Sequence, residues 1–249
     1  MEDFEMLMER YQGAVDTLLA KIRTTQKEAI TKAGEMVADA VENGGCIFLS
    51  GIVHGIENDL IYRGGGPIFY KHFSYDLKIE NNARQRDRSD LGIKTEGAAA
   101  RYALSMSNIR PGDVLFVSSV SGRTPSVVEL AYEAVQMGVK VIALTSMEYT
   151  KEVAPVHSCG KKLYEIATLT LDNCAPAAEA MLEVPGIEAH FAAASGIGSD
   201  YILWSLTAVA VEKMLTDGYT PGILKSANYP GGNDYNKTVI EPHYEQYGW

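Results

Sequence analysis

Two apolar runs that do not alternate with polar residues place the strongest limit on how this chain can fold. Residues 46–49 and 114–117 are apolar at every position, and each run follows a turn sequence, Asn43-Gly44-Gly45 or Pro111-Gly112-Asp113. Strands of this composition are covered on both faces, which is typical of parallel sheets joined by crossover helices. The two runs therefore predict an α/β fold.

Most of the chain between and around these strands has the apolar spacing of helices. Apolar residues recur at helical spacing over 7–22, 30–41, 127–135 and 203–214. Further strands are predicted at 139–144 and, more weakly, at 166–171. Because strands and helices alternate without a clear linker, we predict one three-layer αβα sandwich with a parallel sheet at 44–220, preceded by a helical extension at 1–43.

The last segment, 221–249, is rich in Gly, Pro and Asn and has little periodicity, so we expect irregular chain there. It still carries five aromatic residues, which are Tyr229, Tyr235, Tyr244, Tyr247 and Trp249. Together with Met8, Leu18 and Ile22 near the N-terminus, they form more apolar surface than a monomer usually leaves contiguous. We therefore expect the segment to pack on the body or on a partner subunit of a homo-oligomer.

Composition and charge exclude several classes of protein. The chain has 249 residues, of which 46% are hydrophobic, and its 22 basic and 32 acidic side chains give a net charge of −10. Nucleic acids and anionic membranes attract clustered positive charge, so we expect neither as a partner. No apolar run approaches the roughly 20 residues that cross a bilayer, and the first residues do not resemble a signal peptide.

The cysteines indicate a reducing environment. Cys46, Cys159 and Cys174 are widely spaced and form no Cys-x-x-Cys pair, which argues against a disulfide framework or a zinc site. We therefore expect a cytoplasmic protein with no bound metal.

A hydroxyl-rich loop follows the second apolar run. Residues 118–125 read Ser-Ser-Val-Ser-Gly-Arg-Thr-Pro, and a helix is predicted to begin near Pro125. In open parallel sheets, ligands bind beyond the carboxyl ends of the strands, and hydroxyls with free N–H groups at a helix N-terminus favour an anion. We favour a phosphate site here, while simple helix capping by Ser121 or Thr124 is the alternative.

The same loop carries a family resemblance. Residues 119–124 match the S-x-S-G-x-T signature of sugar isomerase (SIS) domains, and the surrounding chain resembles the phosphoheptose isomerase-like branch, including a bacterial group described as phosphosugar isomerases. The resemblance implies a flavodoxin-like sheet, a homodimer or homotetramer, and a phosphorylated sugar as ligand. It also implies that Ser119, Ser121 and Thr124 hold the phosphate, with Ser118 as an accessory donor.

The turn after the first strand departs from this family. It reads Ser50-Gly51-Ile52-Val53-His54-Gly55, in which Gly51 and His54 fit the family's glycine-rich turn but Val53 replaces a glycine. The segment from here to Arg63 is also shorter than in the family. His54 is a candidate for contacting a substrate hydroxyl or for acid/base work, and donation to a backbone carbonyl is the alternative.

Three carboxylates are candidates for the catalytic base that the resemblance implies. The branch places a carboxylate just before a leucine on the following helix, which corresponds to Asp59 here, with Glu57 as the alternate residue. A solvated first-turn carboxylate is the alternative for Asp59. Glu96 resembles a family position that faces the sugar across the cleft. The histidines that phosphoheptose isomerases carry on the last long helix are absent from 199–215.

These features predict a cytoplasmic aldose–ketose isomerase that acts on a sugar phosphate through an enediol and needs no cofactor. Two other functions stay open. One is a non-catalytic phosphosugar sensor or regulatory subunit that has lost the base. The other is an etherase or deaminase acting on an amino-sugar phosphate, because SIS folds serve several reactions.

Overall fold

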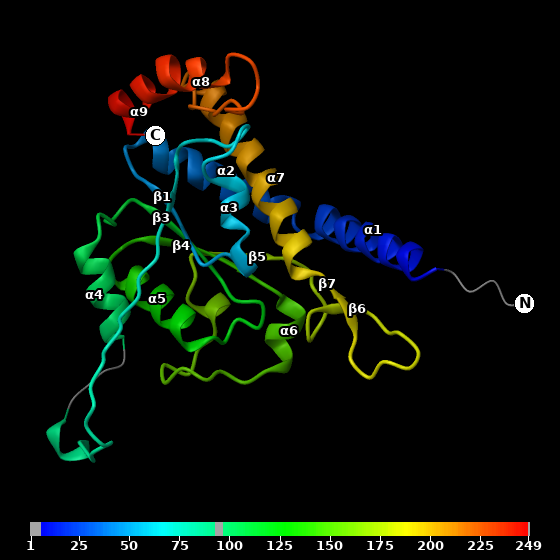
Figure 1. Cartoon of the computed structure of the whole chain (residues 1–249), viewed down its shortest axis with the longest axis vertical. Helices are drawn as coiled ribbons and strands as arrows, with labels where there is room; N and C mark the ends of the chain where they lie inside the picture. The colour runs from blue at the N-terminus through cyan, green and yellow to red at the C-terminus, as the bar shows by residue number, and fades with distance from the viewer. Residues whose placement is uncertain (1–5, 93–96, 249) are drawn as a thin grey trace, which may run out of the picture.

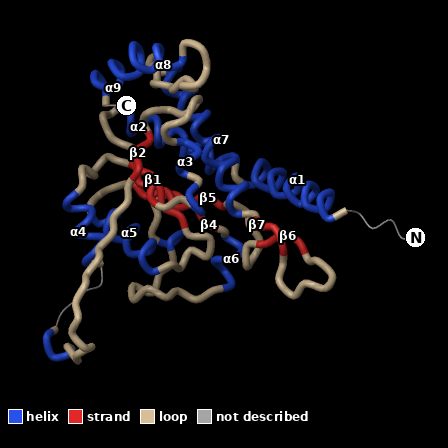
Figure 2. Tube along the Cα trace, viewed as in Figure 1, coloured by secondary structure: helices blue, strands red, loops and turns tan. Residues whose placement is uncertain are grey.

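A single parallel sheet forms the centre of the molecule. The computed structural model describes residues 6–92 and 97–248. Its five main strands lie in the order β2-β1-β3-β4-β5, all parallel (Figures 1 and 2). The strands are β1 (Ile47–Ser50), β2 (Tyr70–His72), β3 (Val114–Ser118), β4 (Lys140–Thr145) and β5 (Leu169–Asp172). The predicted α/β fold with a parallel sheet is confirmed.

Helices cover both faces of this sheet. One face packs against α1 (Leu7–Thr25), α2 (Lys27–Glu42), the short α3 (Glu57–Leu60) and the long α7 (Ser195–Thr216). The other face packs against α4 (Ala98–Met106) and α5 (Pro125–Gln136). Shorter helical elements between these are α6 (Met147–Glu152) and the 3-10 turns Val53–Gly55, Ser89–Leu91 and Leu163–Glu165. The two N-terminal helices predicted from periodicity are present.

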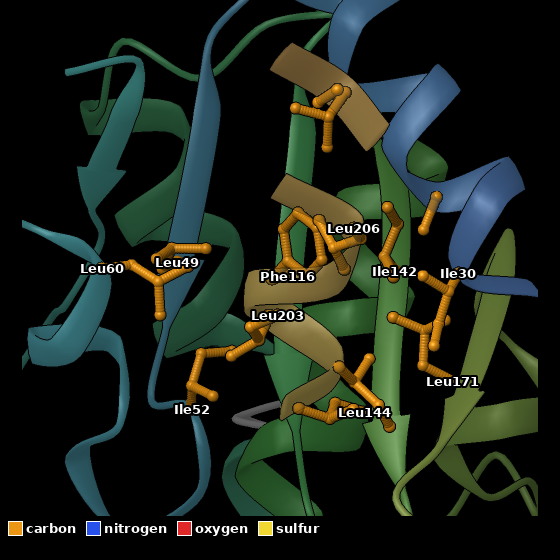
Figure 3. Packing of buried hydrophobic residues seen from close by; sticks show 14 of the residues in the cluster. Ile30, Leu49, Ile52, Leu60, Phe116, Ile142, Leu144, Leu171, Leu203 and Leu206 are labelled. Carbon is orange, nitrogen blue, oxygen red and sulfur yellow. The ribbon is translucent and has the colours of Figure 1, made fainter. Parts of the chain in front are cut away.

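Strand alternation divides the core into two layers. Val114 and Phe116 of β3 belong to the cluster beneath α7, whereas Leu115 and Val117 belong to the cluster beneath α5. Figure 3 shows Phe116 beside Leu203 and Leu206 of α7. Because all of β3 is buried, its sequence has no polar alternation, and this is the pattern that predicted the fold.

Helices α2 and α7 approach closely at one glycine. A Cβ added at Gly34 of α2 would lie 2.6 Å from the backbone oxygen of Leu206. This close packing fixes α7 over the sheet. A Cβ added at Gly198 would lie 2.5 Å from the backbone oxygen of Asn173, which follows β5, so the N-terminus of α7 lies at the carboxyl ends of the strands.

The segment after residue 220 differs from the irregular chain predicted for it. It forms α8 (Gly232–Tyr235), a π-helical turn (Asn236–Ile240) and α9 (Glu241–Tyr247). The side chain of Asn236 accepts from the backbone N–H of Lys225 and donates to its carbonyl, which ties the helical turns to the preceding loop. Together they form one continuous helical run over 232–247, and its π turn interrupts the 3.6-residue period that would mark a helix in the sequence. Trp249 lies outside the described residues.

An antiparallel hairpin was not predicted. Strands β6 (Ala180–Leu182) and β7 (Phe191–Ala193) pair beside the N-terminal end of α7. Across residues 6–92 and 97–248, no helix combines the length and apolar character needed to span a membrane.

Candidate functional site

The carboxyl ends of four strands meet at one edge of the sheet. Ser50 of β1 pairs in register with Val117 of β3, Ser118 with Leu144 of β4, and Thr145 with Asp172 of β5. The loops that leave these strands therefore gather at the same edge, where ligands of open parallel sheets bind.

Hydrogen bonds from the next strand and helix fix the loop after β3. Thr145 Oγ1 donates to the carbonyl of Ser119 at 2.7 Å, and Thr150 Oγ1 donates to the carbonyl of Ser121 at 2.6 Å. The backbone N–H of Leu163 donates to the carbonyl of Gly122 at 2.8 Å. Because three loop carbonyls are occupied by the protein, the loop has its conformation before a ligand arrives.

Gly122 is required by this conformation. Its φ is +66°, in the left-handed region, and a Cβ added there would lie 2.1 Å from Thr150 Oγ1. Both the backbone conformation and the close approach favour glycine. A glycine at position 122 is thus required both by the left-handed backbone and by the close approach of Thr150.

Several donors of the loop are free to bind an anion. Within the described residues, the backbone N–H groups of Ser121, Arg123 and Thr124 donate to no other group. Ser119 Oγ and Thr124 Oγ1 hydrogen-bond to each other at 2.9 Å, which leaves one of the two hydroxyls able to donate outward, and the Thr124 side chain makes no capping hydrogen bond to α5. These donors stand at the N-terminus of a 12-residue helix, where the helix dipole favours negative charge. The arrangement supports an anion site more than simple capping.

Ser118 lies apart from these donors. As a residue of β3 it is on the same face as Phe116, toward α7, and it is only 5% exposed. Its Oγ has no hydrogen-bond partner among the described residues. The structure therefore brings Ser119, Ser121 and Thr124 into one loop and directs Ser118 to the other side of the strand.

The turn after β1 exposes His54. The residue has a φ of +55°, its side chain is 68% exposed, and its Nε2 lies 3.1 Å from Glu179 Oε1. The partner is thus a carboxylate, not the backbone carbonyl that was the alternative. Gly51 also has a positive φ, +53°.

Sequence reasoning missed Glu179 and Ser195. Ser195 Oγ donates to the same Glu179 oxygen that contacts His54, and the Glu179 carbonyl accepts from the N–H of Ala194 at 3.0 Å. Glu179 also has a φ of +80°, which is rare for a residue with a side chain. The contact joins residues 125 positions apart, so no local motif signals it.

Asp59 is held by two partners. One carboxylate oxygen pairs with the guanidinium of Arg63, and the other accepts from Trp204 Nε1 at 3.0 Å. Nearby on α7, burial raises the pKa of the Asp200 carboxyl, and the charge of Arg63 opposes that shift. Glu96, the other predicted base, lies outside the described residues.

Glu57 has a different environment from Asp59. It is 7% exposed, and its Oε2 has no hydrogen-bond partner among the described residues. In the part of the chain that the structure describes, no group of three His, Cys, Asp or Glu side chains has the geometry to hold a metal ion.

Comparison with known proteins places this loop in a family. The model of the SIS domain matches residues 10–146, which is more than half of the chain and includes the loop after β3. The chain belongs to the SIS domain family. It is also 31% identical over 242 residues to a UPF0309 protein of Shouchella clausii, covering 96% of this chain and 97% of that one. A UPF0309 protein of Streptomyces griseus is 31% identical over 242 residues and covers 96% of each chain.

Two solved structures share the fold of this SIS domain. The Vibrio vulnificus NanR protein, complexed with ManNAc-6P, matches with a TM-score of 0.52 and 17% identity over 97% of this chain and 70% of that one. The phosphoheptose isomerase GmhA of Neisseria gonorrhoeae matches with a TM-score of 0.50 and 17% identity over 82% and 97%. The SIS match ends at Ser146, so Glu179 and Ser195 lie beyond the segment that carries the family signature.

Proposed function

We propose that this SIS domain protein binds a phosphorylated sugar and interconverts its aldose and ketose forms through an enediol. The observation that carries the proposal is the loop of Ser119, Ser121 and Thr124, with free N–H groups at the N-terminus of α5. A phosphate matches these donors in charge and in number of acceptors. The names of related structures, a complex with ManNAc-6P and a phosphoheptose isomerase, agree with this ligand class.

The proposed reaction moves protons and needs no oxidant. With the phosphate on the loop, the open-chain sugar extends along the edge of the sheet toward the turn after β1. A carboxylate base removes the proton on C2, the electrons of that bond form the C1=C2 double bond, and the carbonyl oxygen takes up the negative charge. The proton returns to C1, while His54 transfers a proton between the two hydroxyl oxygens with its imidazole oriented by Glu179.

A sensor is the second candidate function. The observation in its favour is that both oxygens of Asp59 already have partners, Arg63 and Trp204. If no other carboxylate acts, a bound phosphosugar remains unchanged. Such a protein reports the presence of the sugar without converting it.

A panel of C5 to C7 aldose and ketose phosphates separates the two functions. We expect at least one sugar phosphate to raise the melting temperature and to be converted to its isomer, as followed by NMR. The matched controls are the same sugars without phosphate, which should have little effect. Binding without conversion supports the sensor, and the absence of binding by every phosphate contradicts both.

We further propose a homodimer or homotetramer in a reducing, cytoplasmic environment. The N-terminal end of α1 extends away from the body (Figure 1), with Leu7 and Met8 exposed, and Tyr244 of α9 is also exposed. Leu18 and Ile22, which were predicted to belong to this apolar surface, are instead buried within the molecule because the rest of α1 packs on the core. A second copy of the chain would cover such apolar side chains. All three cysteines are free thiols, in agreement with a reducing compartment. Sedimentation equilibrium at micromolar concentration should give at least twice the 27.1 kDa chain mass, and a monomer would contradict the proposal.

A further inference from the structure

Two buried side chains near the carboxyl edge of the sheet each have an oxygen without a partner. Glu57 is 7% exposed and Ser118 is 5% exposed, and neither Glu57 Oε2 nor Ser118 Oγ hydrogen-bonds to any described residue. Leaving a buried polar group without a hydrogen-bond partner lowers the stability of the fold, and more so when the group is charged. Two such groups at the edge of the sheet where ligands bind indicate a ligand that hydrogen-bonds to both.

Both side chains belong to the same face of the sheet. Ser118 shares the face of Phe116 through strand alternation, and α3, which carries Glu57, packs its Leu60 into the same cluster. Figure 3 shows Leu60, Phe116 and Leu203 in this one layer. Glu57 and Ser118 therefore lie on the α7 side of β1 and β3.

The N-terminus of α7 closes this region. A Cβ added at Gly196 would lie 3.7 Å from Ile56 Cδ1, so the beginning of α3 contacts the beginning of α7. Ser195, at that helix end, is fully buried and donates to Glu179, the partner of His54. Glu57 thus directly follows Ile56, which lies beside the start of α7, and Ser195 at that start bonds to Glu179, the partner of His54.

Glu57 and Asp59 differ in how many of their carboxylate oxygens already have a partner in the protein. Both oxygens of Asp59 are engaged, by Arg63 and Trp204, and its side chain is 40% exposed. Glu57 keeps one oxygen free in a buried environment. A ligand that reaches Glu57 finds a carboxylate oxygen with no protein contact to displace, whereas a base at Asp59 has to act beside Arg63 and Trp204, and this favours Glu57.

We propose that Glu57, and not Asp59, is the base that transfers the sugar proton, and that Ser118 binds a sugar hydroxyl beside it. This inference rests on the isomerase function proposed above. Glu57 takes the proton from C2 as the C1=C2 double bond forms, and it returns that proton to C1. The ligand is an open-chain sugar whose phosphate lies on the loop of Ser119, Ser121 and Thr124, with its hydroxyl-bearing carbons over the end of β3.

The test compares Glu57→Gln with Asp59→Asn in the full-length protein. The probe is the sugar phosphate that the wild type converts in the panel above. We expect Glu57→Gln to lower turnover by about 10² to 10⁴ with little change in sugar phosphate affinity, and Asp59→Asn to lower it less. The matched control is Glu35→Gln on the exposed face of α2, which should leave turnover unchanged.

Thermal stability adds a readout that a structural role would move in the opposite direction. Replacing a buried carboxyl group that has an unpaired oxygen should leave the melting temperature of Glu57→Gln equal to or above that of the wild type, whereas loss of a structural contact lowers it. Ser118→Ala should fold normally and raise KM several-fold. This second variant tests the site even if Glu57→Gln does not fold.

Each outcome has one meaning. The assignment of Glu57 is overturned if Glu57→Gln turns over as fast as the wild type, or if Asp59→Asn loses more turnover than Glu57→Gln does. Either result leaves the proposed isomerase function standing. An unchanged KM in Ser118→Ala overturns the hydroxyl contact. A wild type that converts no sugar phosphate overturns the isomerase function, and the assignment of Glu57 as base with it.

Discussion

The two loops beside the central strands are built in opposite ways. The loop after β3 keeps the family signature at each defining position, and its carbonyls are held by Thr145 and Thr150, which follow in the next strand and helix. The turn after β1 and the α3 helix that follows it depend on distant segments, because Glu179 contacts His54 and Trp204 joins Arg63 in holding Asp59. A sequence signature predicts the conformation of a loop well when nearby residues hold that loop. It predicts much less when the partners of the loop come from distant segments of the chain.

Removing two hydroxyls of the loop after β3 should have the largest effect on binding. Hydrogen bonds to a charged group contribute about 1.5–3 kcal/mol each, so Ser121→Ala combined with Thr124→Ala should weaken phosphosugar binding by tens of fold or more while leaving the fold intact. Isothermal titration measures the affinity. The matched control is Thr31→Ala with Ser105→Ala, whose hydroxyls bond only to their own helices. An unchanged affinity in the loop variant would remove the phosphate assignment.

Gly122→Ala tests whether the loop is fixed before the ligand binds. The alanine would keep a left-handed φ at a cost of about 1–2 kcal/mol, and its Cβ would displace Thr150 Oγ1 from the Ser121 carbonyl. We expect a loss of about 2–3 kcal/mol in the free energy of unfolding, measured by chemical denaturation, together with weaker phosphosugar binding. Gly51→Ala is the comparison in the other turn, because a Cβ there meets no atom within 4 Å. Equal losses in the two variants would contradict the difference between the loops.

Trp204→Phe tests the distant support of the turn after β1. The change keeps the aromatic ring and removes the Nε1 donor to Asp59. One hydrogen bond to a charged, partly exposed group contributes about 1 kcal/mol, so the melting temperature should fall by about 2–4 °C. Phosphosugar binding to the loop after β3 should not change. A melting temperature equal to that of the wild type would show that Trp204 does not hold the turn.

Asp200→Asn should produce the smallest effect, with a defined pH dependence. Burial raises the pKa of the Asp200 carboxyl, so the folded state binds this proton more tightly than the unfolded state does. The ionised carboxylate therefore costs stability at neutral pH, and the cost disappears as the pH falls below the unfolded pKa of about 3.9. We expect the variant to melt slightly higher than the wild type at pH 7, with a difference that shrinks toward pH 4. If the difference in melting temperature between Asp200→Asn and the wild type grew as the pH fell, burial would not be raising the pKa of Asp200.

The sequence predicted those features whose cause is local. The buried runs at β1 and β3, the helical spacing of α1, α2 and α7, and the hydroxyl loop before Pro125 each follow from neighbouring residues. The contact of His54 with Glu179 depends on a hairpin that no periodicity marks, and a π turn interrupts the period of the helical run after residue 231. The orientation of Ser118 follows from strand alternation, but its missing partner is visible only in three dimensions.

The central claim is that the loop after β3 binds the phosphate of a sugar. A crystal structure of the protein, grown with the sugar phosphate that stabilises it most in the panel, tests this claim most directly. We predict phosphate oxygens within hydrogen-bond distance of the side chains of Ser119, Ser121 and Thr124 and of the free N–H groups at the N-terminus of α5. A sugar phosphate bound with its phosphate away from this loop would contradict the account.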